Sequence, residues 1–267
     1  MTRPPVALTI AGSDPSGGAG IQADLKTFSA LGAYGTSVLT ALTAQSTRGV
    51  TGVHVVPTQF VSLQLRTLVA DVAIDAVKIG MLATADMADL VGAFLREHPF
   101  DVVVLDPVMV ATSGDRLLDD DAVAAVRRLL PLASVVTPNV PETAALLDVA
   151  RATSPDELLA QGRELVTAGA NAVLLKGGHL VGPTMVDQFV SAEGVFTVWH
   201  DRVQTNRTHG TGCSLSSALA ALRPQRDSWE CTVRDATGWL HEAIRRSDEL
   251  HVGSGNGPVH HFHAWWP

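Results

Sequence analysis

The chain has 267 residues, 46% of them hydrophobic, so it can bury a large core as one α/β domain or as two smaller ones. A formal net charge of −8 with scattered Lys and Arg argues against nonspecific nucleic-acid binding, because phosphate contacts need clustered basic residues. Two cysteines cannot make a disulfide framework or a four-cysteine zinc site, which favours a reducing cytoplasm. The apolar runs are too short for a signal peptide or a membrane span, so we expect a soluble protein with no membrane partner.

Short runs rich in Val, Ile and Leu alternate with longer amphipathic stretches, which is typical of a parallel sheet covered by helices on both faces. Near the C-terminal third this rhythm changes, and two runs separated by a short turn predict an antiparallel hairpin. No linker interrupts the series. The predicted strands are 6–11, 37–45, 76–79, 102–105, 134–136, 172–175, 186–190 and 195–199, and the predicted helices are 20–30, 58–69, 85–97, 121–130, 142–147, 156–168, 213–222 and 233–250.

A glycine-rich loop follows the first predicted strand. Its pattern Gly18-x-Gly20-x-x-Ala23 matches the dinucleotide fingerprint, which would indicate an NAD-dependent oxidoreductase. That mechanism also needs an acidic residue at the end of the second strand, where this chain has Gln45. Alternatively, the loop and Asp24 face a polar substrate, while the Gln45 amide pairs with a heteroaromatic ring bearing a nitrogen and an amino group. A plain glycine turn is the third interpretation.

Polar side chains follow three later strands at the point where each ends. Asp106 comes directly after a buried strand, and Asn139 and Glu142 come after the next one. The carboxyl ends of parallel strands are where open α/β folds bind ligands, and Asn139 and Glu142 can face one pocket through a magnesium ion. Lys176, followed by two glycines, offers a cation and bare backbone to a polyphosphate. Each of these residues could instead serve as a cap or a turn.

Three further segments have simpler readings. Residues 111–116 form a polar loop that could close over a nucleotide. The acidic run 119–121 precedes a helix with basic residues near its end, as the helix dipole prefers, so we interpret it as structural. The histidines of 260–263 could bind a metal, but adjacent histidines face different ways, and we favour a loop-like tail without one.

The segment 208–213 precedes a run of small residues that reads as a helix. Gly210 and Gly212 let backbone N–H groups converge at the helix N-terminus, which predicts an anion site. Cys213 would lie beside that anion, where the helix dipole favours its thiolate form and makes it a candidate base or nucleophile. An inert buried cysteine and a thiol hydrolase built on Cys213 and His209 are the alternatives. No Walker loop occurs, so any use of ATP would not depend on one.

Seven ordered motifs resemble those of the bacterial hydroxymethylpyrimidine/phosphomethylpyrimidine kinases, of the ribokinase-like superfamily. The resemblance implies a single three-layer α/β/α domain over 1–267, with a mostly parallel sheet and a C-terminal antiparallel hairpin. It implies a cytoplasmic homodimer that uses ATP and Mg²⁺ to phosphorylate 4-amino-5-hydroxymethyl-2-methylpyrimidine to its monophosphate and then to the diphosphate, for thiamine biosynthesis. The motifs lie at 11–14 with 17–26, 43–50, 78–81, 106–109, 139–142, 176–179 and 209–213.

The resemblance also implies roles for particular residues. Cys213 stands where sugar kinases of the superfamily carry an aspartate base, on a turn made by Gly210, Thr211 and Gly212. Gln45 would pair with the pyrimidine, Met81 would line its pocket, and Asp24 would lie near the hydroxymethyl group. The implied sets are Gln45, Asp24, Met81, Gly12 and Val108 for the substrate, Lys176, Asn139 and Thr211 for ATP, and Asp106, Glu142 and Asn139 for the metal.

Two rivals to this activity share part of the pattern. A pyridoxal kinase of the same superfamily has the same glycine loop and Cys213. A non-catalytic pyrimidine-binding protein would keep Gln45 but lose the phosphate-binding residues, and this chain has Asp106, Asn139 and Lys176. The sequence therefore favours a kinase.

Overall fold

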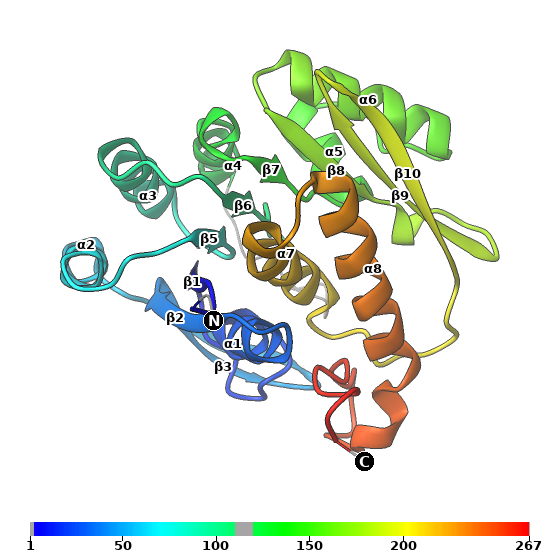
Figure 1. Cartoon of the computed structure of the whole chain (residues 1–267), viewed down its shortest axis with the longest axis horizontal. Coiled ribbons are helices and arrows are strands. Elements are labelled where there is room, and N and C mark those ends of the chain that lie inside the picture. The colour runs from blue at the N-terminus through cyan, green and yellow to red at the C-terminus, as the bar shows by residue number, and fades with distance from the viewer. Residues whose placement is uncertain (1–2, 110–119, 267) are drawn as a thin grey trace.

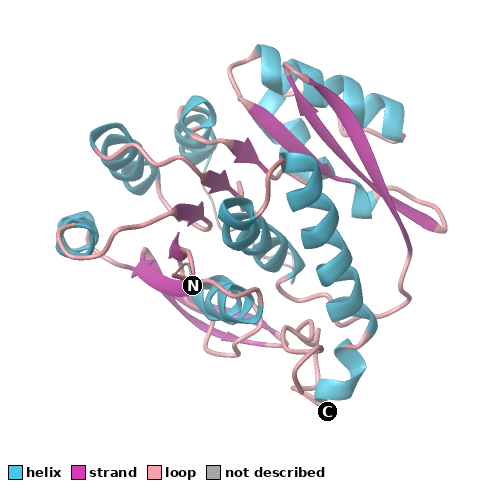
Figure 2. Ribbon diagram, in the orientation of Figure 1, coloured by secondary structure: helices cyan, strands magenta, loops and turns pink. Residues whose placement is uncertain are grey.

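A computed structural model describes residues 3–109 and 120–266, and within them a mixed sheet of eight strands forms the centre of the molecule (Figures 1 and 2). Its strands are β1 (Val6–Ala11), β2 (Tyr34–Leu39), β5 (Ala76–Ile79), β6 (Val103–Leu105), β7 (Val135–Val136), β8 (Ala172–Lys176), β9 (Thr184–Ser191) and β10 (Gly194–Asp201). The spatial order is β10-β9-β8-β7-β6-β5-β1-β2. The six strands from β8 to β2 pair in parallel, and β9 and β10 add an antiparallel hairpin. The predicted fold class is confirmed.

Alternate side chains of each central strand face two separate apolar layers. Leu8 and Ile10 of β1 pack into one layer, while Ala7 packs into the other. The helices divide in the same way, because one layer is covered by α2 to α6 and the other by α1, α7 and α8. Their bounds are α1 Gly20–Ala30, α2 Thr58–Val69, α3 Ala85–Glu97, α4 Asp120–Arg127, α5 Val140–Leu147, α6 Pro155–Thr167, α7 Thr211–Leu222 and α8 Trp229–Arg245.

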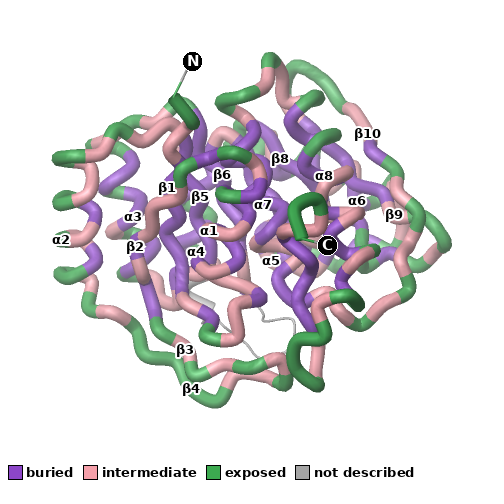
Figure 3. Tube along the Cα trace, turned by 60° about the horizontal axis from the view of Figure 1, so that its bottom comes forward, coloured by how far each residue is buried: buried purple, intermediate pink, exposed green. Residues whose placement is uncertain are grey.

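The predicted strand 37–45 is wrong in one respect, because the chain leaves the main sheet at Thr40. The Thr40 backbone N–H still donates to Ala11, and its hydroxyl donates to the Met81 carbonyl. Beyond it, β3 (Ala41–Ser46) pairs antiparallel with β4 (Gly49–Val55) in a separate two-stranded sheet. Figure 3 shows this sheet as largely exposed, away from the buried central strands. The sequence did not predict β4. Most of its side chains are exposed, so its sequence has no continuous apolar run of the kind that marks a buried strand.

Two helices begin earlier than predicted, in each case directly after a serine that caps the helix. Ser228 accepts the Cys231 N–H, so α8 begins four residues before the predicted 233, and it ends at Arg245, where a 3₁₀ turn follows. Ser154 caps α6 in the same manner. The predicted loop 111–116 and Asp119 of the acidic run lie outside the described residues. In the described part of the chain, we find no helix long and apolar enough to cross a membrane.

Candidate active site

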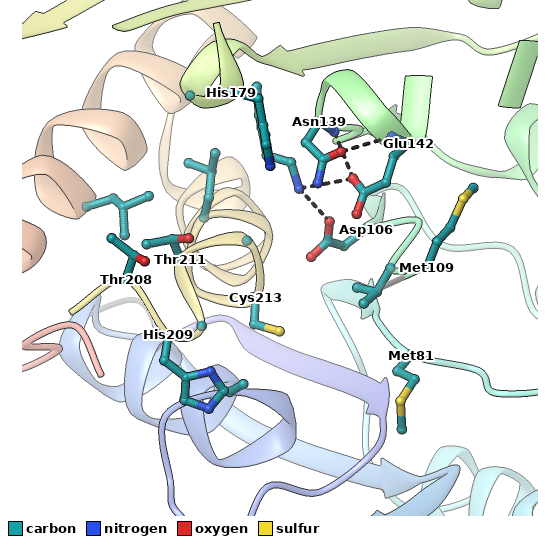
Figure 4. Close-up of a pocket in the computed structure, with 18 of the residues that line it drawn as sticks. Met81, Asp106, Met109, Asn139, Glu142, His179, Thr208, His209, Thr211 and Cys213 are labelled. Atoms are coloured by element: carbon teal, nitrogen blue, oxygen red, sulfur yellow. Dashed lines mark hydrogen bonds and ion pairs between the residues drawn. The ribbon is translucent and has the colours of Figure 1, made fainter. Parts of the chain in front are cut away.

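A cavity of about 1020 Å³ opens at the carboxyl ends of β1, β5, β6, β7 and β8 (Figure 4). It brings together most of the residues that the sequence singled out from seven distant segments. One end is lined by the loop after β1 and by β3, and the other by the ends of β7 and β8. Of the predicted site residues, the cavity wall contains Gly12, Gln45, Met81, Asp106, Val108, Asn139, Glu142, Lys176, Gly210, Thr211, Gly212 and Cys213.

The glycine turn before α7 lies in the middle of the cavity wall. Gly210 is the N-cap of α7 with a φ of 81°, and a Cβ on it would lie 1.7 Å from the Gly18 carbonyl oxygen. Only glycine fits this position. Among the described residues no side chain caps α7, so the N–H groups of Gly212 and Cys213 are available to an anion at the positive end of the helix.

Cys213 lies where the N-termini of two helices meet. It belongs to the first turn of α7, and its Sγ accepts a hydrogen bond from the Gly20 N–H at the start of α1. Burial nevertheless raises the pKa of the Cys213 thiol to about 11, although Lys78 and the Gly20 N–H act in the opposite direction. The expectation that the dipole keeps this group as a thiolate is therefore wrong. Desolvation outweighs the dipole, and the resting group is a thiol.

Lys176 is bracketed by two carboxylates at the far end of the cavity, those of Asp106 and Glu142, which Figure 4 shows facing the same space. Its Nζ lies 2.9 Å from Asp106 Oδ1 and 3.6 Å from Glu142 Oε2. Burial alone would lower the pKa of Lys176, but the two carboxylates raise it above its usual value. For Glu142, burial is the largest cause and raises the pKa to about 7, against the opposing effect of Lys176. This cluster concentrates groups that bind phosphate and metal.

Asn139 and Glu142 also form the capping box that starts α5. Asn139 Oδ1 accepts the Glu142 N–H at 2.9 Å, and Glu142 Oε2 accepts the Asn139 N–H at 2.7 Å. Asn139 and Glu142 therefore both cap α5 and line the cavity. Asn139 Oδ1 accepts one hydrogen bond in the cap, which leaves its second lone pair open to a cation and its Nδ2 donor open to phosphate.

The acidic groups fit magnesium held partly by water and phosphate. Asp106 and Glu142 supply carboxylate oxygens, the ligands that Mg²⁺ prefers, but both oxygens of Asp106 also accept hydrogen bonds, from Lys176, Thr137 and Ser216. The described residues contain no group of three or more His, Cys, Asp or Glu that could hold an ion alone. Magnesium usually enters kinase sites on one or two carboxylates together with substrate phosphates, and this site has that form.

Asp24 does not face the cavity as expected. Its side chain is fully buried, and both carboxylate oxygens accept from Lys78 Nζ, at 2.8 and 2.9 Å. Thr9 and Ser217 complete its shell with bonds of 2.6 and 2.7 Å. Lys78, not Asp24, lines the cavity. Asp24 therefore holds Lys78 in place, because a buried ammonium without a partner is too costly.

At the opposite end of the cavity, the loop after β1 meets Met81 and Gln45. A Cβ on Gly12 would lie 2.3 Å from Met81 Cε, so glycine leaves the room that the Met81 side chain fills. Figure 4 shows Met81 and Cys213 lining the same space. Met81 and Val108 give this end apolar surface, and the Gln45 amide is one of several polar side chains beside it, a combination that suits a flat ring with polar edges.

Several residues of the site were missed as individual residues. Lys78 interrupts the buried strand β5, and a charged residue inside an apolar run was the signal for it. Asp14 and His209, 2.7 Å apart and both buried, had no pattern to reveal their pairing across the chain. Asp187 lines the cavity beside Gly177, and burial raises its pKa to about 6 despite the Gly177 N–H bond.

The histidine-rich tail packs beneath the site. His260 and His261 are buried, and His261 Nε2 lies 2.9 Å from the hydroxyl of Ser214 on α7. Burial lowers the pKa of His261 to about 3, so it is neutral. This contact gives the tail a structural role behind the glycine turn.

The N-terminus of α7 and the side chain of Lys176 face each other at the carboxyl edge of this mostly parallel sheet. This arrangement places the chain among the ribokinase-like kinases. A family model described as phosphomethylpyrimidine kinase matches residues 14–260. The chain belongs to that family.

Relatives and solved structures agree with this assignment. The chain is 56% identical over 261 residues to the hydroxymethylpyrimidine/phosphomethylpyrimidine kinase of Escherichia coli strain K12, which covers 97% of this chain and 98% of that protein. It is 50% identical to the protein of the same description from Rhizobium meliloti strain 1021, over 98% of each. Among solved structures, a Bacillus subtilis pyridoxal kinase in complex with ADP is 32% identical, with a TM-score of 0.90 over 98% of this chain and 99% of that one. A Clostridium difficile 630 phosphomethylpyrimidine kinase is 37% identical, with a TM-score of 0.80 over 90% and 99%.

Proposed function

We propose that this protein is an ATP-dependent kinase that phosphorylates 4-amino-5-hydroxymethyl-2-methylpyrimidine and then converts the monophosphate to the diphosphate, for thiamine biosynthesis. One observation carries the proposal. A single cavity joins the Gln45 end, suited to an aminopyrimidine, to the Lys176 end, suited to a polyphosphate, with the glycine turn and Cys213 between them. The family membership and the relatives' names support the same reaction.

The phosphate apparatus works mainly by holding charge. Phosphoryl transfer breaks the bond from the terminal phosphorus of ATP to ADP and forms a bond from phosphorus to the substrate oxygen, through a loose transition state. We assign the stabilisation of its equatorial oxygens to the N–H groups of Gly212 and Cys213 and to Lys176. Asn139 Nδ2 adds a donor for ATP. Asp106 and Glu142 would hold magnesium, directly or through water, and the ion would supply charge neutralisation between the phosphates.

The acceptor end positions the alcohol. Gln45 pairs with the ring, and Gly12, Met81 and Val108 pack around it. Cys213 takes the alcohol proton when it is in its thiolate form, next to the ammonium of Lys78. Because the phosphate ester made in the first step is already anionic, the second step needs no base.

The test is a turnover assay. Incubation with MgATP and the aminopyrimidine alcohol should give the monophosphate first and the diphosphate later, resolved by chromatography over time. Pyridoxal is the matched competitor, because a pyridoxal kinase from Staphylococcus aureus, solved with AMP-PCP and pyridoxal, has a TM-score of 0.90 to this chain at 30% identity. A higher kcat/KM for pyridoxal than for the pyrimidine would refute the proposed function.

We also propose that the chain works as one domain, in a cytoplasmic homodimer that covers the β3–β4 sheet. Leu42, Val53 and Val55 on this sheet are 45%, 46% and 36% exposed, and a two-stranded sheet alone is marginally stable in water. Sedimentation should give the mass of a dimer, and Leu42→Glu, on the face of the sheet opposite the cavity-lining Thr43, should give a monomer. A monomeric wild type would refute the dimer.

A further inference from the structure

Four polar side chains form a chain of contacts along the acceptor end of the cavity. Asp14 is 1% exposed and His209 is 6% exposed, with Asp14 Oδ2 2.7 Å from His209 Nε2. His209 Nε2 lies 3.4 Å from the atom placed as Gln45 Nε2, and the atom placed as Gln45 Oε1 lies 3.2 Å from Thr43 Oγ1; only hydrogen bonding tells the two ends of such an amide apart. We call Asp14, His209, Gln45 and Thr43 the orienting relay. All four line the cavity.

The first link of the orienting relay fixes the proton of His209. Asp14 accepts the backbone N–H groups of Gly18 and Ala19 and two bonds from Ser16. Burial alone would raise the pKa of Asp14, but the bonds from His209 and Ser16 lower it below its usual value. A carboxylate only accepts hydrogen bonds, so the hydrogen of the 2.7 Å contact is on His209 Nε2.

The ring of His209 has little freedom to leave this position. A Cβ on Gly18 would lie 2.3 Å from His209 Cδ2, so the imidazole edge packs directly on the glycine backbone. The backbone N–H of His209 also donates to the Gly257 carbonyl at 3.1 Å. The one hydrogen on His209 Nε2 goes mainly to Asp14 at 2.7 Å, and an acceptor on Gln45 at 3.4 Å receives the weaker branch of a bifurcated bond.

The last link fixes the amide of Gln45. The single hydrogen of the Thr43 hydroxyl goes to the Ser13 carbonyl at 2.8 Å, so Thr43 can only accept from Gln45. At the other end, a nitrogen of the amide facing His209 Nε2 would set two donors against each other. The reversed orientation of the amide suits both contacts: the Gln45 nitrogen donates to Thr43, and the Gln45 oxygen takes the weaker, shared branch of the His209 Nε2 hydrogen.

We propose that Asp14 and His209 are positioning residues that fix the polarity of the Gln45 amide and thereby select a ring with an acceptor nitrogen beside an amino group. This inference rests on the proposed function. The fixed amide has one N–H and one oxygen lone pair left for the ring, which complement the ring nitrogen and the 4-amino group of the pyrimidine. The 4-oxo analogue presents an N–H beside a carbonyl, so it would need the amide turned over, at the loss of both relay contacts.

The experiment compares two alcohols that differ only in carrying a 4-amino or a 4-oxo group. The ratio of their kcat/KM values is measured for the wild type, Asp14→Asn and His209→Phe. Because both substrates are assayed on one preparation, the ratio does not depend on the fraction of folded enzyme. We expect the amino preference to fall by about tenfold or more in both variants, since an asparagine lets His209 Nε2 become an acceptor and a phenylalanine removes it. His260→Phe, which removes a buried histidine outside the cavity wall, should keep the wild-type ratio.

Dissociation constants for the same two rings, measured by calorimetry without ATP, separate the relay from the reaction. A wild type that binds the amino ring in preference to the oxo ring, with the preference lost in both variants, supports the relay even if turnover fails and the proposed function falls. A wild type that binds the two rings equally, or variants that keep the wild-type ratio in both assays, would overturn the relay.

Discussion

Replacing Cys213 should separate the two phosphorylation steps. With a thiol pKa of about 11, roughly one molecule in 10⁴ carries the thiolate at pH 7, so a first step that uses it as base should accelerate about tenfold per pH unit up to the pKa. In Cys213→Ala the first step should lose about 10²- to 10⁴-fold in kcat and most of its pH dependence. The second step, whose acceptor is an anionic phosphate ester, should change little.

Coupled release of ADP, measured separately with the alcohol and with the monophosphate as acceptor, gives both rates. Cys231→Ala is the matched control, because that cysteine is also free but lies exposed in the first turn of α8, outside the cavity wall. Equal losses in both steps of Cys213→Ala would show that the thiol acts by packing instead. A first step in the wild type that is independent of pH from about 6.5 to 9.5 would refute the base role as well.

Three further predictions concern the cavity wall. Gly210→Ala should slow both steps by about 10²-fold or more, because its φ of 81° and a 1.7 Å approach to backbone force the turn to move, whereas Gly238→Ala, with open space, should not. Lys78→Met should lower the free energy of unfolding in urea by about 3–5 kcal/mol by leaving Asp24 buried and unpaired, and adding Asp24→Asn should restore most of it; an unchanged Lys78→Met would contradict this. Since Mg²⁺ competes with the proton of Glu142, whose pKa is about 7, the half-saturating Mg²⁺ concentration should fall about tenfold from pH 6 to pH 8, and Glu142→Gln should abolish that trend.

The spacing of apolar runs and the turn residues between them predicted most strands of the main sheet. Buried parallel strands such as β1 and β5 are short apolar runs, and this pattern predicted them. The ends of β6, β7 and β8 bring Asp106, Asn139 and Lys176 into one cavity. The β3–β4 sheet was not predicted, because neither strand has a continuous buried face. Its place in the fold depends on a turn at Thr40, where tertiary hydrogen bonds rather than local pattern end the strand.

The site was predicted by position but not by environment. Sequence placed Cys213 at a helix N-terminus and so favoured the thiolate, yet the ionisation of a thiol depends on how much water reaches it, which no local motif encodes. The prediction that Asp24 faces the substrate was wrong for a similar reason. Its neighbours Lys78 and Ser217 come from 54 and 193 residues away, and only the folded chain shows that they enclose it.

The contact between Gly18 and Gly210 has a consequence for the order in which activity is acquired during folding. The two backbones belong to opposite ends of the chain, and such distant partners meet only after the intervening strands have closed the loop between them. A folding intermediate with the central sheet in place but the C-terminal helices undocked would have secondary structure and no turnover. Recovery of activity after dilution from denaturant should therefore lag behind recovery of the circular dichroism signal.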